Sequence, residues 1–111
     1  MDLNTYQQKA ALTAIYPGRG RYKGLTYCAL KLNGEAGEVA EQVGKSMRDD
    51  KETLTEDRRL KLKAELGDVL WYVAMLAMEL GCSLDHIAEI NLQKLAVRQA
   101  RNVLHGEGSD R

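Results

Sequence analysis

Residues 64–80 read Ala64-Glu65-Leu66-Gly67-Asp68-Val69-Leu70-Trp71-Tyr72-Val73-Ala74-Met75-Leu76-Ala77-Met78-Glu79-Leu80. On a helix, their apolar side chains cover most of the circumference and leave one narrow polar strip. That strip carries Glu65, Asp68, Tyr72 and Glu79. A helix that is apolar nearly all round is buried all round, and one small chain has few other helices to enclose it. We therefore expect a homo-oligomer in which this helix packs against its own chain and a second copy; a compact monomeric bundle is the alternative.

Helical patterns extend over the rest of the chain. We expect a first helix over about residues 3–15 and a second over about residues 25–46. A third begins after the N-cap Thr55 and ends at Gly81, and a fourth begins after the N-cap Ser83 and ends near Asn102. Strand signals are weak, because the chain has no Phe and no clear alternation of apolar and polar residues. The sequence predicts an all-α fold with a four-helix core, a single domain over residues 1–111 and a flexible tail over about residues 105–111.

Composition excludes several classes of protein. The 111 residues suit one domain, and 44% hydrophobic with 29% charged residues indicates a globular chain. The formal net charge is zero, so nothing global attracts nucleic acid or an anionic membrane. The longest apolar run, residues 69–78, is shorter than the ~20 residues a membrane span needs. With no leader pattern and two widely separated cysteines, Cys28 and Cys82, we expect a cytoplasmic protein with free thiols and with no nucleic-acid or membrane partner.

Two short acidic motifs carry the strongest chemical signal. Glu35-Ala36-Gly37-Glu38 lies in the second predicted helix and Glu65-Leu66-Gly67-Asp68 in the third. The i, i+3 spacing places both acids of each motif on one helix face, at the edge of the apolar stripe. If the two helices pack antiparallel, four carboxylates converge, and their repulsion favours either raised pKa values or a divalent cation. An all-oxygen site suits Mg²⁺ or Mn²⁺. Either motif alone would be an ordinary solvated pair, whereas the two together predict a metal site.

The stretch Gly34-Glu35-Ala36-Gly37-Glu38-Val39, followed by the nine residues Ala64 to Tyr72, closely resembles the MazG-like nucleoside triphosphate pyrophosphohydrolases of the all-α NTP pyrophosphatase superfamily. The resemblance covers nearly the whole chain, including Asn91-Leu92-Gln93-Lys94-Leu95, Arg98 and the tail. One departure is Gly34, where many members carry a further acid that would belong to the outer part of the metal shell.

The resemblance implies hydrolysis of a (d)NTP to the monophosphate and pyrophosphate. It implies Mg²⁺, replaceable by Mn²⁺, held by Glu35, Glu38, Glu65 and Asp68, in a helical core that assembles as a homodimer or homotetramer. Glu38, with Glu35 beside it, is our first candidate to hold or deprotonate the attacking water.

Several other residues are candidates to bind the substrate. Asn91, Lys94 and Arg98 recur along one face of the last helix, where phosphate oxygens would pair with them; long side chains that extend to solvent are the alternative. Tyr72 shares the acidic strip and is expected to contact substrate.

The loop with Arg19, Arg21 and Lys23 is expected either to cover the substrate as a lid or to be an ordinary solvated loop, and it lacks the ending of a P-loop. Two further aromatic residues lie near the acidic motifs. Trp71 fits the core or an interface, and Tyr27 fits either a base contact or the core.

Base choice depends on the shape of the pocket, which the sequence does not reveal. We place a purine nucleotide such as (d)GTP first, and a pyrimidine-specific dUTP or dCTP hydrolase or a (d)NDP hydrolase as alternatives. A hypothesis of a different class is a non-catalytic helical oligomer, an interaction module whose acids serve only its solubility.

Overall fold

The computed structural model describes residues 1–101, and this part of the chain forms four helices and no strand. α1 spans Leu3–Ala11, α2 spans Tyr22–Asp49, α3 spans Glu56–Glu79 and α4 spans Leu84–Ala100. The predicted all-α, four-helix fold is thereby confirmed. The predicted flexible tail and the predicted end of the last helix at Asn102 lie outside the described residues.

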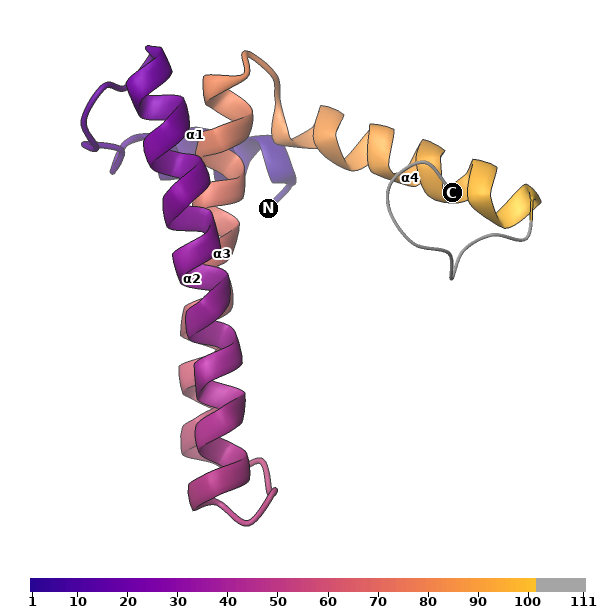
Figure 1. Cartoon of the computed structure of the whole chain (residues 1–111). Coiled ribbons are helices and arrows are strands. Elements are labelled where there is room, and N and C mark those ends of the chain that lie inside the picture. The colour runs from indigo at the N-terminus through magenta and orange to yellow at the C-terminus, as the bar shows by residue number, and fades with distance from the viewer. Residues whose placement is uncertain (102–111) are drawn as a thin grey trace.

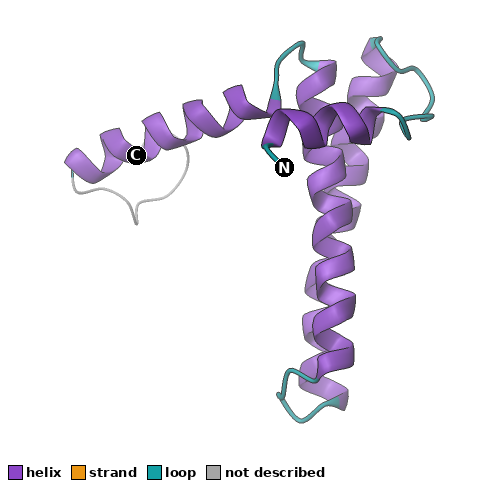
Figure 2. Ribbon diagram, turned by 180° about the vertical axis from the view of Figure 1, so that it is seen from behind, coloured by secondary structure: helices purple, strands orange, loops and turns teal. Residues whose placement is uncertain are grey.

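The helices form an L rather than a closed bundle. α2 and α3 pack side by side as a long antiparallel hairpin, α1 crosses one end of it, and α4 leaves that end and points away (Figure 1). The view from behind shows α1 lying across the hairpin (Figure 2). The axes of α3 and α4 differ by 97°. The radius of gyration is 16.6 Å, whereas a compact domain of this length has about 13 Å.

Side-chain caps define the starts of α3 and α4, as predicted. The hydroxyl of Thr55 accepts a hydrogen bond from the backbone N–H of Arg58 at 3.1 Å. The hydroxyl of Ser83 accepts one from His86 N–H, also at 3.1 Å. Each cap satisfies a backbone donor that has no partner within the helix.

The first helix is shorter than predicted, and the second is longer. α1 ends at Ala11 rather than near residue 15, because the next three N–H groups bond to carbonyls three residues back. Such tight turns end an α-helix, and Pro17 disfavours helical backbone at the residue before it. α2 starts at Tyr22 and continues to Asp49, beyond both predicted ends.

The loop before α2 is held against the end of α3. The carboxylate of Glu79 accepts hydrogen bonds from Gly20 N–H at 2.7 and 3.0 Å. Gly18 and Gly20 have φ values of 73° and 81°, which residues with a Cβ atom rarely adopt. At Gly24 a Cβ would collide with the carbonyl of Gly18. Glycine is therefore required for this loop to turn closely over α3.

A buried glutamine joins three elements at the corner of the L. The side-chain amide of Gln7 donates to Ala74 O at 3.0 Å and to Cys82 O at 3.3 Å, and its oxygen accepts from Leu84 N–H at 3.0 Å. Only 5% of Gln7 is exposed. Through this side chain α1 connects α3 to the start of α4, and so holds the angle between them.

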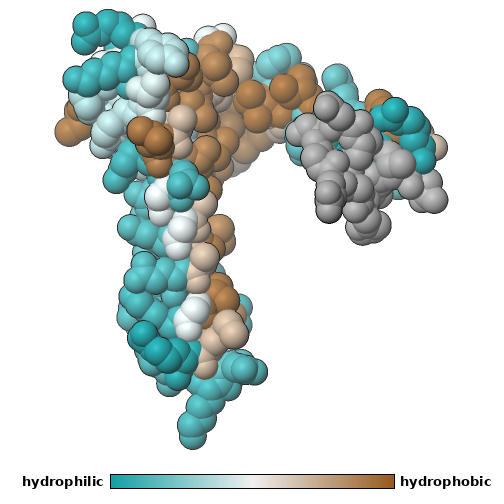
Figure 3. Space-filling view, in the orientation of Figure 1, coloured by the Kyte–Doolittle hydropathy of each residue, from teal (hydrophilic) through white to brown (hydrophobic). Residues whose placement is uncertain are grey.

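The hydrophobic core is small and lies where α1 crosses the hairpin. Its buried members are Ala10, Ala14, Tyr16, Cys28, Ala74, Met75 and Leu84. Cys28 and Cys82 are free thiols, as predicted. Beyond this core, large apolar side chains of α3, of its C-cap residue and of α4 are open to solvent in the single chain, among them Leu66, Leu70, Leu80, Ile90, Leu92 and Val97. Figure 3 shows a continuous apolar surface over the upper hairpin and the first part of α4.

The helix at residues 64–80 is therefore not buried all round within one chain. The buried residues of α3 are Ala74, Met75 and Ala77. Other apolar side chains of α3, such as Leu66 and Leu70, are exposed, because α4 turns away instead of folding back along the hairpin. Within residues 1–101, no single helix is long and apolar enough to cross a membrane. α3 and α4 reach that length and composition only as a sharply bent pair.

Candidate metal centre

Three carboxylates meet between the two long helices. Glu35 and Glu38 lie one turn apart on α2, and Glu65 faces them from α3. One oxygen of each lies within 4.8 Å of one oxygen of each other residue. We call these three residues the carboxylate cluster. The antiparallel hairpin thus brings together three of the four acids that the two motifs contain.

The fourth acid, Asp68, lies beside the carboxylate cluster. Together with Glu35 it lines an open hollow with a volume of about 340 Å³, whose other walls are Thr13, Trp71 and Tyr72. This hollow is referred to below as the acid–aromatic hollow. It places an aromatic wall directly beside two carboxylates.

Burial, hydrogen bonding and mutual repulsion together raise the pKa values of two acids in the carboxylate cluster. Partial burial, followed by the charges of Glu38 and Asp68, raises the pKa of Glu35, and Lys31 partly offsets this. A hydrogen bond with Glu38 raises the pKa of Glu65, to which desolvation and the neighbouring negative charges add.

Within residues 1–101, no ion pair involves the three acids of the carboxylate cluster or the neighbouring Asp68. The atom Oε2 of Glu65 is buried, and within the described residues it has no hydrogen-bond partner. A buried polar atom without a partner is costly, and a cation would supply what it lacks. An oxygen-only set of ligands fits a hard divalent ion such as Mg²⁺ or Mn²⁺.

Four aromatic rings pack next to the carboxylate cluster. Tyr16 and Tyr27 are stacked, with ring centroids 5.7 Å apart and an interplanar angle of 7°. Trp71 meets Tyr16 edge-on at 6.1 Å and Tyr72 at 4.9 Å. The structure therefore places Tyr27 in a packed aromatic group. Burial and the neighbouring Tyr27 raise the pKa of Tyr72 to about 12, so its hydroxyl keeps its proton at neutral pH.

One polar contact in this region escaped the sequence analysis. The indole N–H of Trp71 donates to the hydroxyl of Thr13 at 3.0 Å, and that hydroxyl donates to Ala10 O at 2.8 Å. The two residues are 58 positions apart. No local pattern signals such a pair, because it depends on how α1 crosses the hairpin.

The predicted phosphate-binding residues of α4 lie away from the carboxylate cluster within one chain. Asn91 and Lys94 line a separate hollow of about 300 Å³ with Ile87 and Ile90, and Arg98 is buried. In the described part of the chain, α4 packs against α1 and α3 but not against α2. The structure of one chain therefore does not join these residues to the acids.

The predicted basic loop divides into two parts. Arg19 faces the protein: its guanidinium donates to Ala14 O at 3.0 Å and approaches the sulfur of Met78 at 3.9 Å. Arg21 and Lys23 are exposed. Arg19 thus helps to hold the loop in place, while the other two side chains are accessible from solution.

Comparisons with known proteins agree with this architecture. The model of the MazG nucleotide pyrophosphohydrolase domain matches residues 24–103. The chain is 46% identical to the Gene 37 protein of Mycobacterium phage L5 over 114 residues, covering all of both chains. It is 33% identical over 72 residues to the uncharacterized protein YvdC of Bacillus subtilis strain 168, covering 60% of this chain and 68% of that protein. No solved structure matches the chain.

Proposed function

The chain belongs to the MazG nucleotide pyrophosphohydrolase family, and we propose that it hydrolyses nucleoside triphosphates to the monophosphate and pyrophosphate. The observation that carries this proposal is the carboxylate cluster, in which oxygens from two helices lie within 4.8 Å of one another. The buried Glu65 oxygen without a hydrogen-bond partner supports a cation as the missing partner. Glu35, Glu38, Glu65 and Asp68 would hold Mg²⁺, with Mn²⁺ able to replace it.

The bound cation would neutralise the triphosphate, orient it and lower the pKa of a water molecule. Glu38 is the most exposed member of the carboxylate cluster, so it is the one we assign to the attacking water, with Glu35 beside it. A carboxylate here would hold the water and take its proton as the new oxygen–phosphorus bond forms. The phosphoanhydride bond breaks in the same reaction, and pyrophosphate leaves with its electron pair.

We further propose that the active form is a homodimer or homotetramer. The apolar side chains of α3 and α4 that are exposed in one chain, such as Leu66 at 56% and Leu92 at 65%, support this. So does a radius of gyration well above that of a compact domain. A second copy would also let Asn91, Lys94 and Arg98 approach phosphates held at another copy's acids. Sedimentation velocity checks this proposal: Leu66→Asp should yield monomer, and a wild-type monomer would contradict it.

The substrate contacts assigned to Tyr72, Arg21 and Lys23, and a role of the Arg19 loop as a lid, stay part of the proposal. We place purine nucleotides first and pyrimidine nucleotides or diphosphates second, and we expect the protein to act on free nucleotides in the cytoplasm. A non-catalytic oligomer remains the competing hypothesis.

A direct assay separates these possibilities. The purified protein is incubated with the eight common (d)NTPs and dUTP, and with the diphosphates, in the presence of Mg²⁺ or Mn²⁺, and pyrophosphate and phosphate are quantified. Pyrophosphate release that Glu38→Gln abolishes would support the proposal. The matched control is Glu41→Gln, one turn further along α2, where the carboxylate pairs with Lys45 at 3.2 Å; it should retain activity. Absence of both pyrophosphate and phosphate release with every nucleotide would contradict the enzyme hypothesis.

A further inference from the structure

The acid–aromatic hollow is lined by two chemically different kinds of side chain. The carboxylates Glu35 and Asp68 line it together with the aromatic residues Trp71 and Tyr72. A nucleotide has the same two parts, a charged phosphate chain and a flat base. The fifth wall residue, Thr13, precedes residue 24, where the family match begins. This wall is therefore built in part by a segment that the family model does not cover.

The ring of Trp71 is held in one orientation. Its N–H donates to Thr13, and Tyr16 and Tyr72 meet it at interplanar angles of 86° and 78°. The Thr13 hydroxyl already donates its proton to Ala10 O, so it has no donor left for a ligand. Its place in the hollow is explained by what it does to the indole ring rather than by a direct contact with substrate.

We propose that Trp71 stacks on the base of the bound nucleotide, and that Thr13 is the positioning residue that sets the indole ring for this contact. The inference rests on the proposed function and adds to it the group that reads the base. Tyr27 is a weaker candidate, because it is already stacked on Tyr16. An indole overlaps the two rings of a purine more fully than the single ring of a pyrimidine, and stacking otherwise tolerates any base. The site should therefore prefer purine nucleotides.

Fluorescence tests the contact without any turnover. Trp71 is the single tryptophan of the chain, so its emission reports on this site alone. We expect a non-hydrolysable purine nucleoside triphosphate, added with Mg²⁺, to quench the emission more strongly than its pyrimidine counterpart, and tripolyphosphate to leave it nearly unchanged. Emission that no nucleotide alters would overturn the proposal even if the protein hydrolyses nucleotides. Quenching without hydrolysis would instead contradict only the proposed reaction.

Kinetics of variants give a second, independent readout. Losing one base–aromatic stack corresponds to a rise in KM of roughly 5- to 150-fold. We expect a rise in this range for Trp71→Leu with kcat nearly unchanged, and a smaller rise for Trp71→Phe, which keeps a ring but lacks the N–H. The inhibition constant of tripolyphosphate should stay the same, because it has no base. An equal loss of affinity for tripolyphosphate would overturn the proposal in favour of a general structural role.

Thr13 supplies the matched pair of variants. Thr13→Val removes the hydroxyl at nearly constant shape and should raise KM several-fold. Thr13→Ser keeps the hydroxyl, so its KM should stay near the wild-type value. The control is Thr53→Val: this hydroxyl also donates to a carbonyl three residues back, Asp50 O at 2.6 Å, but lies at the far end of the hairpin. A KM for Thr13→Val equal to that of Thr53→Val would overturn the positioning role.

Discussion

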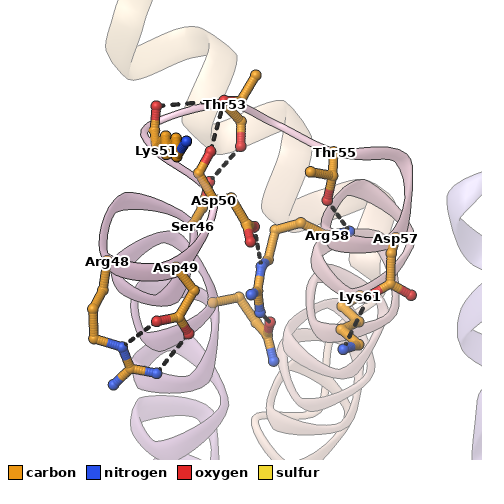
Figure 4. A network of polar contacts seen from close by, with 11 residues as sticks. Ser46, Arg48, Asp49, Asp50, Lys51, Thr53, Thr55, Asp57, Arg58 and Lys61 are labelled. Atoms are coloured by element: carbon orange, nitrogen blue, oxygen red, sulfur yellow. Dashed lines mark hydrogen bonds and ion pairs between the residues drawn. The ribbon is translucent and has the colours of Figure 1, made fainter.

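The two regions of the α2–α3 hairpin use the same acidic residue types in opposite ways. At the hairpin tip, residues 46–58, the carboxylates of Asp49 and Asp50 pair with arginine side chains, as Figure 4 shows. In the middle of the hairpin, Glu35, Glu38 and Glu65 meet one another. An acid beside a cation stabilises the turn it belongs to. Acids gathered without a cation oppose folding, and this arrangement is typical of a binding site for a positive ion.

A network of polar contacts holds the hairpin tip together. The guanidinium of Arg58 donates to Asp50 at 3.0 Å and to Gln42 at 2.8 Å, and its side chain is only 11% exposed. Ser46 donates to Thr53 O at 2.9 Å. These bonds close a turn in which Lys51 and Glu52 take the unfavourable positive φ. The tip is therefore held by polar contacts rather than by a hydrophobic core.

The largest expected effect is on activity, in the middle of the hairpin. Glu65→Gln should reduce pyrophosphate release by about 10²- to 10⁴-fold, a size typical of losing a catalytic or metal-holding group. Its stability to urea should be unchanged or higher, because a repelling charge is removed. The counterpart at the tip, Asp50→Asn, should keep its activity and lose stability. If Glu65→Gln and Asp50→Asn each lost both activity and stability, the two regions would not differ in the way described.

Next in size is the loss of stability at the hairpin tip. Arg58→Met keeps much of the side-chain volume but leaves Asp50 without its partner. We expect a decrease of about 2 kcal/mol in the free energy of unfolding, because the pair is largely shielded from solvent. Urea unfolding followed by circular dichroism measures it. The exposed pair Arg59–Glu56 provides the control: Arg59→Met should change stability by under about 1 kcal/mol. Equal losses in both variants would contradict the structural role of the buried pair.

A smaller effect is expected from the cation itself. Mg²⁺ at ten times its dissociation constant should stabilise the folded protein by about 1.4 kcal/mol, raising the thermal midpoint, and excess chelator should reverse the change. The increase should vanish in Glu65→Gln and persist in Arg58→Met. If Glu65→Gln kept the full increase, the cation would be binding elsewhere.

The smallest expected effect is a difference in pH dependence between the two regions, measured without metal. The pKa of Glu35 is raised above 4.5 in the folded state. As the pH falls from neutral, this carboxylate therefore binds its proton in the folded state at a higher pH than in the unfolded state, and the folded state gains stability. The pKa of Asp49 is lowered below 3.8 by its hydrogen bond with Arg48, so its stabilisation is present above that value and is lost as pH falls through the lowered pKa.

Urea unfolding between about pH 3 and pH 7 measures both contributions. Glu35→Gln should remove the gain in stability that appears above pH 4.5 as the pH falls, and Asp49→Asn should remove the loss that appears below pH 3.8. Identical pH profiles for wild type and Glu35→Gln would show that folding does not raise the pKa of Glu35.

What could be predicted from the sequence was local. The spacing of Glu35 and Glu38 sets the face they share, and a hydroxyl at Thr55 or Ser83 caps whichever helix follows it. The antiparallel pairing of the two long helices follows from the short connection between them. These features depend on neighbours within a few residues, and they hold whatever the rest of the chain does.

What could not be predicted depends on contacts between distant segments. Thr13 and Trp71 meet only because α1 crosses the hairpin at one particular place. Gln7 looks like an ordinary polar residue of an amphipathic helix, yet it is buried and joins three elements. The direction of α4 likewise does not follow from its own residues, because the bonds that hold it come from α1.

The contact made by Gln7 turns α4 into a lever. With 17 residues the helix is about 25 Å long, so a rotation of about 10° at its start moves its far end by roughly 4 Å. One buried amide near the N-terminus thereby governs the reach of Lys94 and Arg98, which lie about three and four turns along α4 from its contact with Leu84. A change as small as Gln7→Leu could leave every candidate metal ligand untouched and still misalign the cationic side chains with the phosphates they are proposed to hold.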